Sequence, residues 1–131
     1  MKTRLKPKDT LPGLHLLGDF YDCRCDQRYM IDDSLLADHC KQLVVEAGLN
    51  AIQALFHRFG EGDGAIGVTG MIVLAESHMS LHTWPEEHYV TIDVYVCNHS
   101  ADNRGKAQTL FDALVNTFQP GDPHVWRIDR A

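Results

Sequence analysis

The stretch YVTIDVYVC at residues 89–97 alternates along its length between branched apolar side chains and larger or polar ones. Side chains of an extended strand point alternately to opposite faces, so this pattern predicts a strand with one buried face. The positions expected to face the core are Val90, Ile92, Val94 and Val96. The positions expected on the opposite face are Tyr89, Thr91, Asp93, Tyr95 and Cys97. A thiol on that second face is open to a substrate.

Working outward, the sequence predicts further strands at residues 14–21, 51–59, 68–75 and 124–128. A first helix is expected to begin at the capping run 32–34 and to end at Gly48. Its apolar face keeps helical spacing at Leu36, Cys40, Leu43, Val44 and Ala47. A second helix, capped by Ser100 or Asp102, carries Ala107, Leu110, Phe111, Leu114, Val115 and Phe118. The prolines at 120 and 123 end it.

These elements follow the order βαβββαβ. They predict a single α+β domain over residues 1–131, built as a two-layer sandwich of one mainly antiparallel sheet with two helices on one face. Residues 1–12, which hold four scattered basic side chains, are expected to be a flexible leader. The sheet face without helices needs a cover, so we expect the protein to dimerise through it.

A serine follows the strand-like apolar run 71–75, at the start of the polar segment ESHMSLHTWPE at residues 76–86. The Oγ of Ser77 can attack the carbonyl of Glu76 and convert the amide to an ester, provided that the peptide is strained and the oxyanion is stabilised. A nearby hydroxyl would help, and Thr69 could supply it if the chain bends. Elimination of the ester then needs a base with a pKa near neutrality, usually a histidine.

This segment, with a cysteine twenty positions after Ser77, resembles the prokaryotic S-adenosylmethionine decarboxylases. Residues 56–59 (FHRF) and 67–70 (GVTG) match the same family. Its proenzymes cut themselves before the motif serine and convert that serine into a pyruvoyl group, which is a covalent cofactor for decarboxylation. The resemblance implies a cut between Glu76 and Ser77, assisted by the Thr69 hydroxyl, with His82 as the base that removes the serine α-proton.

The resemblance also implies a substrate and an assembly. S-adenosylmethionine would lose carbon dioxide and become the aminopropyl donor of spermidine synthesis. Cys97 would return a proton to the substrate α-carbon, Glu86 would bind the ribose, and Phe59 would stack on the substrate. Trp84 is a further candidate for an aromatic contact with the substrate, with ordinary packing as the alternative. The small bacterial members pair two protomers with active sites between them, so a homodimer is implied here.

Several alternatives remain open at this point. The loop at residues 60–67 looks longer than in the short bacterial enzymes, Asp19 replaces a usual glutamate, and His88 and Asn98 replace usual glycines. The same pyruvoyl chemistry on another amino acid, such as arginine or ornithine, is therefore one alternative. Others are a binding or scaffold homologue that never cleaves, or a metal module using His78, His82 and Cys97, with zinc as the first choice. We expect no metal.

Charge and composition restrict the partners. The formal net charge is −6 and no run of basic residues is present, which argues against nucleic acid as a main partner. No apolar stretch approaches the ~20 residues needed to span a membrane, and no secretory core is visible, so we expect a cytoplasmic protein without membrane contact. The cysteines form no regular pairs and are expected to be reduced, with Cys23 and Cys40 structural and Cys25 without an assigned role.

Overall fold

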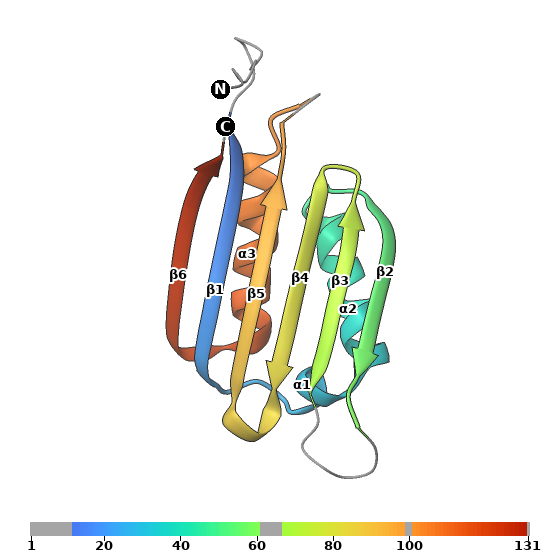
Figure 1. The fold of residues 1–131 in the computed structure, drawn as a ribbon, viewed down its shortest axis with the longest axis vertical. Helices are drawn as coiled ribbons and strands as arrows, with labels where there is room; N and C mark the ends of the chain where they lie inside the picture. The colour runs from blue at the N-terminus through green and yellow to red at the C-terminus, as the bar shows by residue number, and fades with distance from the viewer. Residues whose placement is uncertain (1–11, 61–66, 99–100, 131) are drawn as a thin grey trace, which may run out of the picture.

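The computed structural model describes residues 12–60, 67–98 and 101–130 (Figure 1). In chain order its elements are β1 (Gly13–Cys23), α1 (Arg28–Ile31), α2 (Asp33–Glu46), β2 (Ala51–Arg58), β3 (Val68–Leu74), β4 (Ser77–Trp84), η1 (Pro85–Glu87), β5 (Tyr89–Val96), α3 (Arg104–Phe118) and β6 (Pro120–Arg130). The strands form one six-stranded sheet in the order β2-β3-β4-β5-β1-β6. Every neighbouring pair is antiparallel.

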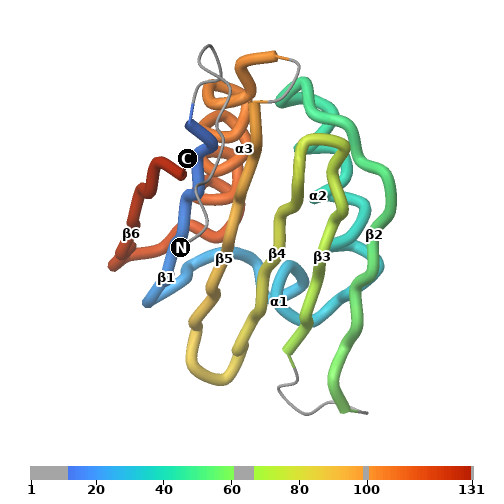
Figure 2. Tube along the Cα trace, turned by 45° about the horizontal axis from the view of Figure 1, so that its top comes forward, coloured from blue at the N-terminus to red at the C-terminus, as the bar shows by residue number. Residues whose placement is uncertain are grey.

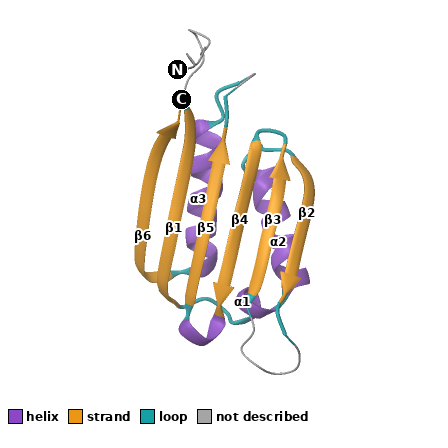
Figure 3. Ribbon diagram, in the orientation of Figure 1, coloured by secondary structure: helices purple, strands orange, loops and turns teal. Residues whose placement is uncertain are grey.

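The long helices cover one face of this sheet, as Figures 2 and 3 show. Helix α2 contacts β2 and β3, while α3 contacts β1 and β5, and the two helices touch each other. The predicted α+β class, with one antiparallel sheet and helices on one face, is confirmed. Among the described residues, no helix is both long and apolar enough to cross a membrane.

The predicted order βαβββαβ is wrong by one strand. Four strands, β2 to β5, lie between α2 and α3, because residues 77–84 form a strand of their own. Ala75 and Glu76 form a two-residue turn that reverses the chain between β3 and β4. The polar motif therefore begins a new strand, in which Met79 and Leu81 point to the core while Ser80 and His82 lie on the opposite face. The short helix α1 was not expected either.

Side-chain caps mark the beginnings of helices α2 and α3, and prolines mark the beginning of strand β6. The Asp32 carboxylate accepts from the backbone N–H of Leu35 at 3.0 Å, which confirms the predicted cap of α2. Before α3, Asp102 Oδ1 accepts from the N–H of Arg104 at 3.1 Å; Ser100 lies outside the described residues. Strand β6 starts at Pro120 and is much longer than the predicted 124–128. It can contain prolines because it is an edge strand, hydrogen-bonded to β1 alone.

The N-terminal boundary also differs slightly from the prediction. Residues 1–11 of the expected leader lie outside the described residues, but Pro12 is tied to the domain, because its carbonyl accepts from Asn98 Nδ2 at 2.7 Å. The Asn98 side chain also accepts from the N–H of Asn103 at 2.7 Å. The asparagine that stands in place of a glycine thus fixes the segment just after Cys97.

The hydrophobic core lies between the sheet and the helices. The apolar positions of β5 are at most 2% exposed, which confirms the predicted alternation: Val90, Ile92, Val94 and Val96. Helices α2 and α3 bury side chains against them: Leu36, Cys40, Val44, Leu110, Phe111 and Leu114. Burying each large apolar side chain stabilises the fold by roughly 1.5–3 kcal/mol. The opposite sheet face exposes large apolar groups instead: Leu55, Phe59, Met71, Val73, Trp84 and Trp126.

Candidate active site

Ser77 follows the turn between β3 and β4, at the top of the sheet in Figure 1. It pairs with Leu74 on β3 and with Val96 on β5, so its position is fixed by strands on both sides. Its φ is 149°, which residues with a Cβ rarely adopt. Such a backbone conformation costs of order 1–3 kcal/mol. The strain lies at the residue whose preceding peptide bond is predicted to break.

The carbonyl oxygen of Glu76 accepts two hydrogen bonds from Cys97. The backbone N–H of Cys97 donates at 2.9 Å, and its thiol donates at 3.2 Å. Cys97 reaches this carbonyl because it directly follows Val96, the β5 partner of Ser77. Two donors on one carbonyl oxygen can stabilise the negative charge that develops when a nucleophile adds to that carbonyl. The backbone donor was not foreseen, because sequence patterns do not show where main-chain N–H groups point.

One imidazole reaches the serine. The Nδ1 of His78 lies 3.3 Å from Ser77 Oγ. Its ring is also near that of Tyr95, with 5.9 Å between the centroids. His78 thus contacts the serine hydroxyl from the neighbouring position in the chain.

Thr69 and His82 form a second group at the other end of β4. They are directly paired across β3 and β4, and Thr69 Oγ1 lies 3.0 Å from His82 Nδ1. His82 is five residues beyond Ser77, which is about 17 Å in an extended strand. The strand β3 continues from Val68 to Leu74 without the bend that would turn Thr69 toward Ser77. Within one chain, the structure therefore does not bring Thr69 or His82 to the Glu76–Ser77 bond.

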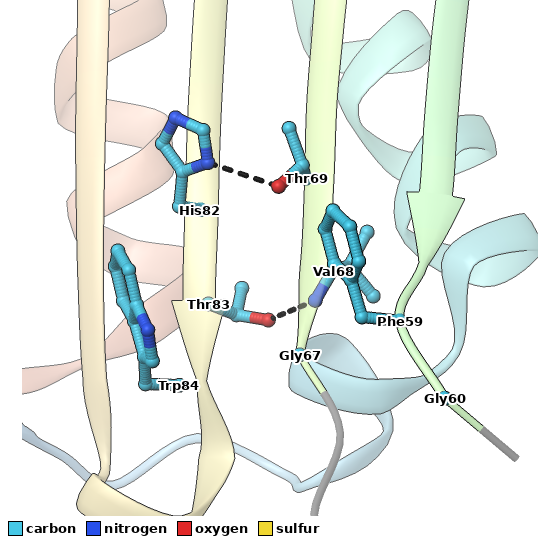
Figure 4. Close-up of a pocket in the computed structure, with 8 residues that line it drawn as sticks. All are labelled: Phe59, Gly60, Gly67, Val68, Thr69, His82, Thr83 and Trp84. Carbon is cyan, nitrogen blue, oxygen red and sulfur yellow. Dashed lines mark hydrogen bonds between the residues drawn. The ribbon is translucent and has the colours of Figure 1, made fainter.

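A cavity of about 410 Å³ lies beside this second group. Figure 4 shows the rings of Phe59 and Trp84 on opposite sides of it, with Thr69 and His82 above them. A Cβ on Gly67 would fall 1.8 Å from the carbonyl oxygen of Thr83, so only glycine allows this close approach. Thr83 also lines the cavity, and two hydrogen bonds hold its side chain in place. Its hydroxyl accepts from the N–H of Val68 at 2.9 Å and donates to the carbonyl of Met30 at 2.7 Å.

The aromatic walls of the cavity are partly exposed. Phe59 is 52% exposed and Trp84 38%. Trp84 also packs near Tyr89, with ring centroids 5.1 Å apart, and burial raises the pKa of Tyr89 to about 12.

Glu86 lies in η1, two residues beyond Trp84, and is exposed. His88 ends η1 with a φ of 51°, which explains why a glycine suits this position.

The cysteines differ in their surroundings. All four are free thiols. Burial raises the pKa of Cys23 and of Cys40 to about 12, so both stay protonated and packed, in agreement with a structural role. Burial also raises the pKa of Cys25. Within the described residues, no group of three histidine, cysteine or acidic side chains is arranged to hold a metal ion.

The fold and this site define a class of α+β protein. In it, a serine with strained backbone, Ser77, follows a residue whose carbonyl oxygen accepts two hydrogen bonds from Cys97. The S-adenosylmethionine decarboxylase family model matches residues 14–131. An S-adenosylmethionine decarboxylase proenzyme of Fervidobacterium nodosum is 36% identical over 113 residues, which cover 86% of this chain and 75% of the relative. One of Pyrobaculum aerophilum is 35% identical over 119 residues, covering 91% and 88%. The crystal structure of the adenosylmethionine decarboxylase of Aquifex aeolicus superposes with a TM-score of 0.79 at 29% identity, covering 92% of each chain.

The chain therefore belongs to the S-adenosylmethionine decarboxylase family. This confirms the resemblance that the motif around Ser77 indicated. The family does not favour the metal-module or scaffold alternatives.

Proposed function

We propose that this chain is a self-processing decarboxylase of S-adenosylmethionine, which makes a pyruvoyl group from Ser77 by cutting the Glu76–Ser77 bond. The observation that carries the proposal is the combination of a positive φ at Ser77 with two Cys97 donors on the Glu76 carbonyl. Strain in the peptide and stabilisation of the oxyanion are the two conditions that attack by the serine requires. The residues at this turn thus fit formation of the group.

Self-processing would begin at the turn. Ser77 Oγ attacks the Glu76 carbonyl carbon, the C–N bond breaks, and the hydroxyl proton ends on the released amine, which leaves an ester. A base then removes the Ser77 α-proton while the Cβ–Oγ bond breaks and the Glu76 carboxylate departs. The resulting dehydroalanine tautomerises, and water releases ammonia to leave the pyruvoyl terminus. The products are residues 1–76 and 77–131.

We propose that the base comes from a second copy of the chain. Thr69 and His82 lie at the opposite end of β4 from Ser77, about 17 Å away in an extended strand. A two-fold axis between facing sheets would bring one end of each chain to the other end of its neighbour. The exposed apolar groups on this face support such packing, because Leu55 is 74% exposed and Val73 45%. The homodimer would then contain two equivalent sites.

In each composite site, the two ends would have different tasks. The pyruvoyl group supplies an electron sink for the electrons that remain when carbon dioxide leaves. Cys97 stands beside the Ser77 terminus and would give a proton to the substrate α-carbon. Phe59 and Trp84 would hold the adenine and the sulfonium cation through stacking and cation–π contacts, and Glu86 would accept hydrogen bonds from the ribose hydroxyls.

Intact-protein mass spectrometry under denaturing, reducing conditions tests this function. We expect fragments 1–76 and 77–131, the second with a pyruvoyl terminus that borohydride traps as an adduct with S-adenosylmethionine. A cut chain that forms an adduct only with arginine or ornithine would overturn the proposed substrate. A chain that stays uncut would overturn the proposed chemistry.

A further inference from the structure

Asn50 lies in the short connection between α2 and β2, on the side of the β3–β4 turn away from Cys97. The connection leaves α2 through Gly48, which has a φ of 85°, and is anchored by Leu49, which is 3% exposed. The N–H of Leu49 donates to the carbonyl of Val44 at 3.1 Å. This anchoring sets the position of Asn50 relative to the core.

Asn50 makes three hydrogen bonds to the two residues that precede the proposed cut. Its carbonyl accepts from the N–H of Ala75 at 2.9 Å. Its backbone N–H donates to Glu76 Oε1 at 3.3 Å, and its side-chain Nδ2 donates to Glu76 Oε2 at 2.9 Å. Both carboxylate oxygens of Glu76 are therefore held by one residue.

We propose that Asn50 is a positioning residue for self-cleavage. It holds Glu76 from the β2 side while Cys97 holds the Glu76 carbonyl from the β5 side. With both anchors in place, the Glu76–Ser77 peptide cannot rotate to release the unfavourable φ of Ser77. The scissile carbonyl then stays on the Cys97 donors and in reach of Ser77 Oγ. This inference rests on the proposed self-cleavage and adds a residue that the family motif around Ser77 does not include.

The contact is placed where it contributes little to overall stability. Asn50 is exposed and Glu76 half-buried, and a hydrogen bond in such a place is strongly solvated. Its effect on reaction geometry can be much larger, because a displacement of about 1 Å in a reacting group can slow a reaction by roughly 100-fold. We therefore expect removal of the Asn50 side chain to slow the cut without unfolding the protein.

The first test is the Asn50→Ala variant, followed from cell-free synthesis so that the uncut chain is seen. Conversion to fragments 1–76 and 77–131 should be at least roughly tenfold slower than in the parent chain. The midpoint of thermal unfolding should stay close to that of an uncut reference, Ser77→Ala, when Asn50→Ala is added to it. Turnover per pyruvoyl group, measured on chains already cut, should be unchanged, because the bond that Asn50 positions is then gone. If Asn50 had only a structural role, the rate of the cut, the midpoint of thermal unfolding and the turnover per pyruvoyl group would all fall.

Hydroxylamine shows which step the variant affects, since it cleaves an accumulated ester. Because the proposed role is to place the carbonyl for attack, hydroxylamine should not restore the cut in Asn50→Ala. Restoration would mean that ester formation is normal, which would overturn the inference.

The matched control is Gln42→Ala. Gln42 Nε2 donates to Glu46 Oε2 at 2.9 Å, an exposed amide–carboxylate bond on α2 far from Ser77 in the chain. This variant should be cut at the parent rate. Glu76→Ala provides an independent route if Asn50→Ala does not fold, and it should be slowed in the same step. The double variant should be no slower than Glu76→Ala alone, because Glu76→Ala already removes the one contact that Asn50→Ala removes.

The outcomes separate the two proposals. If the parent chain is never cut, the proposed function fails. If the parent is cut and Asn50→Ala is cut equally fast, the positioning role of Asn50 alone is wrong.

Discussion

The two ends of β4 differ in their chemistry, and in the function proposed above each carries half of one reaction. At the Ser77 end, the backbone is strained and a carbonyl is held by Cys97. At the Trp84 end, His82 is hydrogen-bonded to Thr69 beside a cavity between two aromatic rings. Ser77, His78 and the Cys97 donors lie at the first end, whereas the cavity lined by Phe59 and Trp84 lies beside Thr69 and His82 at the second.

On the proposed function, a single chain holds the bond to be broken and the substrate pocket at separate places. Antiparallel pairing fixes the separation, because Ser77 faces Leu74 and His82 faces Thr69 on the same neighbouring strand. A strand cannot shorten to bring the ends together. We infer that a second copy unites them, and the predictions below act on one end, on the other, or on the face between.

The largest effect is expected at the Ser77 end. Ser77→Ala removes the attacking oxygen, so the chain should remain uncut and inactive, which denaturing electrophoresis checks directly. Ser80→Ala, three residues further along β4, is the control and should be cut. A cut at Glu76 in the Ser77→Ala variant would mean that another group breaks the bond.

Cys97→Ala should separate processing from turnover. The backbone N–H still donates to the Glu76 carbonyl, so the cut should be slowed only modestly. Loss of a general acid typically costs about 100-fold or more, so turnover per pyruvoyl group should fall by roughly that factor. Cys25→Ala is the control thiol and should be neutral. Undiminished turnover in Cys97→Ala would remove the thiol from its proposed role.

The proposed dimer interface on the helix-free face of the sheet can be tested by placing a charge on it. Met71 is 42% exposed on the outer side of β3, and Met71→Glu would leave an unpaired charge in the proposed interface, which commonly costs about 3–5 kcal/mol. We expect monomers in analytical ultracentrifugation and a large loss of self-cleavage. Val45→Glu, at a 67% exposed position on α2, should leave both unchanged. A monomeric Met71→Glu chain that is still cut at the parent rate would contradict the composite site.

The smallest effect is expected in the helical layer. Burial lowers the pKa of His39, whose Nε2 lies 2.8 Å from Thr117 Oγ1. The folded protein therefore binds the His39 proton less readily than the unfolded chain, which titrates near about 6.5. Stability should fall as the pH drops below that value and should not change with this group above it. His39→Gln should flatten the dependence of the unfolding midpoint between about pH 7 and 5, with the rate of the cut unaffected at pH 7.

The sequence predicted most of the layer structure because buried alternation is a direct consequence of strand geometry. Residues 89–97 gave the correct faces for Val90 and its neighbours. Residues 77–84 were not counted as a strand of their own in the predicted order, because the two-residue turn at Ala75 and Glu76 leaves little signal in the sequence. The motif predicts Ser77, His82 and Cys97 as site residues, but the distances between them depend on strand register, which the motif does not give. Asn50 could not be predicted, since its role comes from a backbone connection that only the fold brings to Glu76.

In the proposed dimer, Ser77 of one chain works with His82 of another. Mixing two inactive variants, Ser77→Ala and His82→Ala, tests it most directly: the chains are unfolded, combined and refolded together, and the His82→Ala chain is followed by mass spectrometry. Each mixed dimer should contain one intact site, so we expect the His82→Ala chain to be cut at Glu76 only in the mixture. If it stays uncut in mixed dimers shown to have formed, or is cut fully on its own, the site does not use His82 from a second copy.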